Sequence, residues 1–108
     1  MKYLPLESCQ RLKHLVINPT NDVWSRTGDE WFESTQRFAH TYEESIPMLY
    51  LEEALNLLPE SVSLSKSAKF GWMVSCHVIF EVPYFFTSQS LLTAVNECLI
   101  KLLDKEII

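Results

Sequence analysis

Among the residues that could do chemistry, the pair Cys76-His77 is the first to test. A cysteine nucleophile needs a histidine within hydrogen-bond reach. Neighbouring residues of a β-strand point to opposite faces of the sheet, so these two side chains are not expected to meet. Cys76 also falls within an apolar alternation, where a free thiol behaves as a small hydrophobic group. We therefore expect Cys76 to be buried and unreactive.

Patterns that would hold a metal or a cofactor are missing from the sequence. The three histidines stand at positions 14, 40 and 77, without metal-ligand spacing, and there is no Cys-x-x-Cys pair. Gly28 and Gly71 stand alone, which excludes a glycine-rich phosphate loop. Adjacent carboxylates such as Glu43 and Glu44 usually mark a solvated face, and acid–base catalysis would need one of them buried. We expect no enzyme, no cofactor and no metal.

Residues 41–65 form an acidic segment with five glutamates and no lysine or arginine. One interpretation is an exposed helix face with its flanks. The other is a surface that docks on a basic partner, in place of a nucleic acid. On the second interpretation we predict partner binding at Glu43, Glu44, Glu52 and Glu53.

Trp24 and Trp31 lie on either side of Thr27-Gly28-Asp29, a sequence typical of a hairpin turn because Gly28 can adopt a positive φ. Tryptophan dominates many protein interfaces, so both residues join the predicted partner-binding set. The alternative is that the two indoles form a small second core.

The composition predicts that residues 1–108 form a single globular domain. The chain is 47% hydrophobic and 21% charged, and its net charge is −5. Lysine and arginine do not cluster, so nucleic-acid binding is disfavoured. No apolar run approaches the roughly 18 residues of a membrane span. An odd number of cysteines and the lack of a secretory signal at the N-terminus indicate a reducing compartment, the cytoplasm.

Hydrophobic periodicity predicts the elements that must position these residues. Leu6, Cys9 and Leu12 recur at helical spacing, and Asn18-Pro19 ends that helix. Residues 35–45 are polar and weakly periodic, which is typical of a loop. The predicted helices cover residues 5–16, 50–58 and 88–105, the last capped by Ser88; the predicted strands cover 22–26, 30–34, 62–64 and 70–82, with a separate edge segment at 84–86.

The strand at 70–82 has the strongest pattern, because apolar residues occupy every second position. A reversal between Ser75 and Val82 would instead split it into two strands. We expect the C-terminal amphipathic helix to lie on the apolar face, which gives an α+β fold with a small antiparallel sheet and helices packed on one face. The predicted core is Leu12, Leu55, Trp72, Val74, Val78, Val95, Leu99 and Leu102.

Several short patterns resemble a loose group of small, uncharacterised phage and prophage proteins. The matching residues are Ser8–Lys13 with Trp24, Ile46-Pro47, Leu51–Leu55, Leu58-Pro59, Gly71-Trp72, Ser90–Val95 and Cys98–Leu103. Val16-Ile17 departs from the glycine that this group often has after the first helix. The resemblance implies a phage or mobile-element origin and carries no activity or functional residues. The strand–strand–helix order of the C-terminal half also looks like antitoxins of the HicB type.

From these observations we expect one of two functions. The first is a non-enzymatic accessory protein of a phage or prophage, located in the cytoplasm of the bacterial host. It would act by binding a host or phage protein, and an inhibitor of a bacterial defence system would be one form of it. The alternative is an antitoxin-like regulator that neutralises its partner. The oligomeric state is left open.

Overall fold

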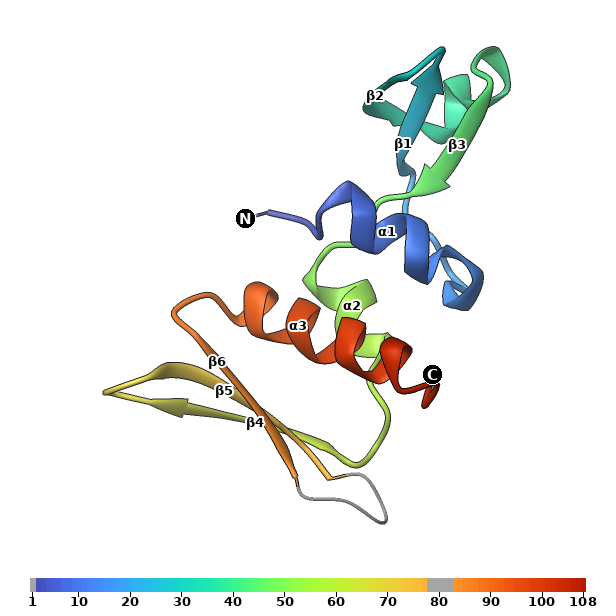
Figure 1. The fold of residues 1–108 in the computed structure, drawn as a ribbon. Helices are drawn as coiled ribbons and strands as arrows, with labels where there is room; N and C mark the ends of the chain where they lie inside the picture. Colours follow the sequence, from blue (N-terminus) through green and yellow to red (C-terminus); the bar gives the residue numbers. More distant parts are fainter. Residues whose placement is uncertain (1, 78–82) are drawn as a thin grey trace.

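In the computed structural model, which describes residues 2–77 and 83–108, two three-stranded antiparallel sheets lie on either side of a layer of helices (Figure 1). The predicted α+β class is confirmed, although the strands are divided between two sheets. The strand orders are β2-β1-β3 and β4-β5-β6. Within the described residues, no helix is long and apolar enough to cross a membrane.

The N-terminal sheet is built on the predicted hairpin. Strands β1 (Asp22–Thr27) and β2 (Glu30–Thr35) pair in antiparallel register around a turn in which Gly28 has a φ of 62°. The segment 35–45 is not the loop that its polarity suggested. It forms the 3₁₀ helix η2 (Gln36–Thr41) and the start of strand β3 (Glu44–Pro47). The sequence does not reveal β3 because the strand is short and forms by pairing with the edge of β1 that β2 leaves open.

The first helix is shorter than predicted. Helix α1 (Leu6–Leu12) tightens into the 3₁₀ helix η1 (Lys13–Leu15) before Pro19 is reached. Helix α2 (Leu51–Leu57) falls inside the predicted span. The N-terminal segment is held against the start of α2, because the Leu4 N–H donates to the Leu49 carbonyl at 2.8 Å and Tyr3 forms an isolated bridge with Tyr50.

The C-terminal sheet carries the main core. Strands β4 (Val62–Ser67), β5 (Gly71–Cys76) and β6 (Tyr84–Ser88) follow one another, and β6 is the edge segment expected after Pro83. The part of the predicted long strand at 78–82 lies outside the described residues. Helix α3 (Leu91–Asp104) packs on β5 and β6. Its N-cap is Ser90, whose hydroxyl accepts from the Thr93 N–H, and not Ser88 as predicted.

The core confirms the predicted register of β5. Five of the predicted core residues are fully buried: Leu12, Val74, Val95, Leu99 and Leu102. Leu55 and Trp72 are only half-buried, and Val78 lies outside the described residues. Trp72 remains partly exposed because it lies toward the β4–β5 turn, where the Lys66 ammonium is 5.4 Å from its ring centre. Phe70 is in the turn itself and is 54% exposed.

Candidate functional site

The structure divides the acidic segment into two parts with different electrostatics. Glu43 and Glu44 are paired with bases that come from elsewhere in the chain. Arg26 Nη1 lies 3.0 Å from Glu43 Oε2, and Arg26 Nε lies 3.5 Å from Glu44 Oε2. Lys13 Nζ is 3.6 Å from Glu44 Oε1. These two glutamates therefore present a partly neutralised surface.

Glu52 and Glu53 lie in the first turn of α2, where negative charge is favourable to the helix. Glu53 is half-buried, and its Oε1 accepts from the Tyr50 N–H at 3.1 Å, which satisfies the backbone donor of the N-cap residue. Glu52 is exposed. Within the described residues neither glutamate has an ion-pair partner.

The two tryptophans share one face of the N-terminal sheet. Trp24 pairs with Glu33 across the strands, and Trp31 pairs with Arg26. Both indoles are half-buried and pack against the hydrophobic core. The guanidinium of Arg26 lies 5.9 Å from the centre of the Trp31 ring. This placement favours a structural role, so Trp24 and Trp31 are weaker candidates for partner contact than the carboxylates around them.

A pocket of about 330 Å³ opens where the N-terminal sheet meets the start of α2. Tyr50 provides a hydroxyl that donates to Asp22 Oδ2 at 2.7 Å. Tyr3 holds the Tyr50 ring in place by an edge contact, with ring centres 5.9 Å apart. The pocket is lined by two carboxylates, three hydroxyls and one thioether: Asp22, Glu33, Ser34, Thr35, Met48 and Tyr50.

The pKa of Tyr50 is raised mainly by its contact with Asp22. It is raised to about 12, first by the hydrogen bond to Asp22, then by desolvation and then by the charges of Asp22, Glu33 and Glu53. Each of these disfavours a tyrosinate anion. Among residues 2–77 and 83–108, no lysine or arginine forms an ion pair with Asp22, Glu33 or Glu53. We name Asp22, Glu33 and Tyr50, together with the nearby Glu53 of α2, the acidic pocket; Glu53 itself lines the neighbouring pocket between η1 and α2.

Sequence reasoning found only Glu53 of the acidic pocket. The predicted hairpin already contained part of the signal, because its register places Asp22 and Glu33 on the same face as Trp24. Tyr50 joins them only through the tertiary packing of α2 against the N-terminal sheet, which no local pattern reveals.

Charge is also distributed unevenly along the chain. Residues 1–60 hold ten of the fourteen acidic residues and five of the nine basic ones. Residues 61–108 hold four of each, so the net charge of −5 belongs to the N-terminal part. The acidic pocket therefore lies in the negatively charged part of the molecule.

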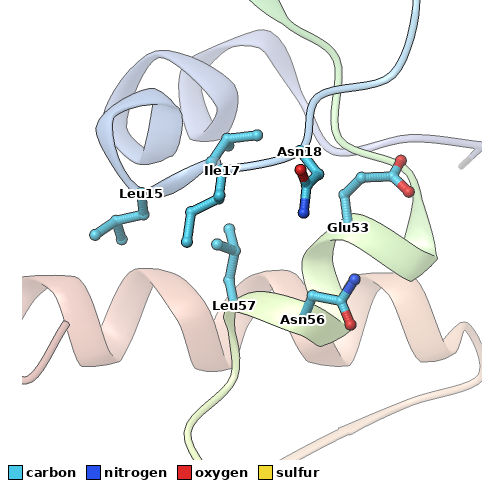
Figure 2. A pocket seen from close by; sticks show the side chains of 7 residues that line it. Leu15, Ile17, Asn18, Glu53, Asn56 and Leu57 are labelled. Carbon is cyan, nitrogen blue, oxygen red and sulfur yellow. The ribbon is translucent and has the colours of Figure 1, made fainter.

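A second pocket, of about 190 Å³, lies between η1 and α2 and is mainly aliphatic. Figure 2 shows Leu57 pointing from α2 toward Ile17, with Leu15 beside them and Asn18, Asn56 and Glu53 on the other side. Ile17 is 88% exposed. The pocket brings no reactive groups together, and its one carboxylate, Glu53, already caps α2.

The cysteines are placed for packing. Cys76 is 1% exposed and Cys98 is fully buried, and neither is in a disulfide. Burial raises the pKa of Cys76, although a hydrogen bond with Cys98 opposes the shift. The pKa of Cys98 rises to about 12, mainly through burial and then through the adjacent Cys76. The expected burial of Cys76 is confirmed, and its low reactivity stays a prediction.

Within the described ranges, no group of three or more histidine, cysteine, aspartate or glutamate residues is arranged to hold a metal ion. Comparisons with protein-family models, with curated proteins and with solved structures give no match to this chain.

Proposed function

We propose that this chain acts by binding a protein that inserts an arginine or lysine side chain into the acidic pocket. One observation carries the proposal. Asp22 and Glu33 line one pocket with Tyr50, whose hydroxyl donates to Asp22 Oδ2 at 2.7 Å, and no base within the described residues is paired with either carboxylate. A guanidinium offers five donors in a fixed plane and pairs well with carboxylates.

The walls of the pocket suit such a side chain. The hydroxyls of Ser34 and Thr35 offer further acceptors at the rim, and the Met48 thioether gives the aliphatic stem an apolar contact. Met48 is buried, so the floor is formed by the core of the protein and is rigid. A rigid, preformed site loses less entropy on binding than a flexible one.

The short sequence patterns that resemble phage and prophage proteins support a role for this binding function in a phage or prophage. We propose that the chain is an accessory protein of a phage or prophage, and that its partner is a host or phage protein with a basic surface. Inhibition of a host defence protein is one form that this function would take. In this proposal the protein acts by binding its partner and catalyses no reaction.

An antitoxin-like regulator is the second candidate. It is favoured by the succession of β5, β6 and α3, in which a helix packs on the strands that precede it. A regulator of this type would bind a basic toxin, so the acidic pocket would serve both functions. Co-expression with a candidate toxin distinguishes them, because only an antitoxin restores growth.

The test compares conservative variants of the two acidic surfaces. The tagged protein is used to capture partners from bacterial lysate, and captured proteins are identified by mass spectrometry. The triple variant Asp22→Asn, Glu33→Gln, Glu53→Gln removes three charges but keeps the hydrogen-bonding groups. We expect it to lose a partner that the native protein captures at low salt and releases at high salt.

The matched control is the double variant Glu43→Gln, Glu44→Gln, whose charges are paired with Arg26 and Lys13. It should retain the partner. Retention by the triple variant, or equal loss in the control, would overturn the assignment to the acidic pocket. Unchanged thermal unfolding of both variants shows that the fold is intact.

A further inference from the structure

A third pocket, of about 220 Å³, lies between α1 and α3 and away from the acidic pocket. Its lining combines one acid, one base, two neutral polar side chains and two apolar ones: Pro5, Glu7, Ser8, Arg11, Asn96 and Ile100. A single water molecule needs only roughly 10–15 Å³. The pocket therefore has room for a small organic molecule.

Two of its polar groups lack hydrogen-bond partners within the described residues. The Asn96 Oδ1 atom is buried and accepts no hydrogen bond. Ser8 is 5% exposed as a residue, and its hydroxyl has no hydrogen-bond partner in that part of the chain, although the oxygen is not itself a fully buried atom. Buried polar groups in folded proteins are almost always hydrogen-bonded. One such atom on the wall of the pocket, Asn96 Oδ1, points to a polar ligand.

The charged residues of the pocket define the chemistry of that ligand. Glu7 has no ion-pair partner among the residues that the structure describes. Arg11 is paired with Asp104 through Nη2, which leaves most of its N–H donors available. A cation would face Arg11 and an anion would face Glu7, so a ligand with one charge meets repulsion in either case. A zwitterion satisfies both residues.

We infer that this pocket binds a small free α-amino acid. Its ammonium group donates to the Glu7 carboxylate and to Asn96 Oδ1, and its carboxylate accepts from Arg11. The Ser8 hydroxyl completes the polar wall. Pro5 and Ile100 contact a short aliphatic side chain. This site is independent of the proposed protein-binding function.

The test titrates the intact protein with L-alanine and L-valine and follows the backbone amide of Ser8 and the side-chain amide of Asn96 by NMR. Saturable shifts of both signals are expected. Isobutylamine and 3-methylbutanoate are matched probes, since each is valine without one of its charged groups. Both should bind at least about tenfold more weakly than L-valine, because each loses a charge-assisted contact.

Variants assign the roles of the residues. Glu7→Gln and Asn96→Ala should each weaken L-valine binding about tenfold. Asp104→Asn removes the partner of Arg11 but no pocket wall, so it should leave binding equal or tighter. Glu60→Gln, on another part of the surface, is the control. The inference is overturned if neither amino acid gives saturable shifts, if both matched probes bind as well as L-valine, or if a crystal soaked in L-valine shows only water.

Discussion

At the scale of single residues, Tyr50 reports on the acidic pocket through its titration. Its pKa of about 12 lies above the ordinary value of 10.0. Because the folded pKa is the higher one, the neutral phenol stabilises the fold fully below pH 10. This contribution is lost as the pH rises from 10 to 12, so stability should fall over that window.

We predict that one tyrosine of the native protein titrates near pH 12 in an absorbance titration of tyrosinate, and that Tyr50→Phe removes this transition. Asp22→Ala should move the transition down toward 10, because the hydrogen bond to Asp22 is the first cause of the shift. Glu52→Gln is the control and should leave it in place. A native transition at the ordinary value would show that the carboxylates do not converge on Tyr50.

Gly71 gives a second prediction at this scale. It has a φ of 77°, and a Cβ there would lie 2.7 Å from the Ser88 carbonyl oxygen. Gly71→Ala should therefore lower the free energy of unfolding by about 3 kcal/mol, from backbone strain and the clash together. Gly28→Ala meets open space and should cost only about 1 kcal/mol. Urea unfolding measures both, and equal losses would refute the close approach of β5 and β6.

At the scale of elements, the stability of helix α3 depends on its N-cap residue, Ser90. The Ser90 hydroxyl accepts from the Thr93 N–H, one of the unpaired donors in the first turn. We expect Ser90→Ala to destabilise the protein by about 1 kcal/mol in urea unfolding. Ser65→Ala, at an exposed position of β4, should have little effect. If the two variants unfold alike, the cap contributes nothing to stability.

The elements also show what local sequence can predict. Helix α2, helix α3 and the β1–β2 hairpin were predictable because each has its own periodicity, stop signal or turn residue. Strand β3 was not, since it exists through pairing with β1. The same limit applies to the sites. Glu53 was found by its charge, and it contacts Tyr50 locally at the start of α2. Asp22 lies 28 positions before Tyr50, and only the fold brings it to the Tyr50 hydroxyl.

At the scale of the whole molecule, the placement of a sheet on each side of the helices makes the protein elongated (Figure 1). Its extents are 45 × 30 × 24 Å and its radius of gyration is 15.1 Å. A compact domain of this size would have a radius of about 13 Å. Small-angle X-ray scattering of the monomer should give a value near 15 Å. A value near 13 Å would contradict the separation of the sheets.

The uneven charge of the two parts of the chain has a consequence for how the protein meets a partner. An excess of −5 in residues 1–60, beside a balanced C-terminal part, gives the molecule an electric dipole. In the field of a basic protein the dipole exerts a torque that turns the N-terminal sheet, and with it the acidic pocket, toward the partner before contact. Orientation during approach raises the fraction of collisions that are productive, and dissolved salt weakens this effect.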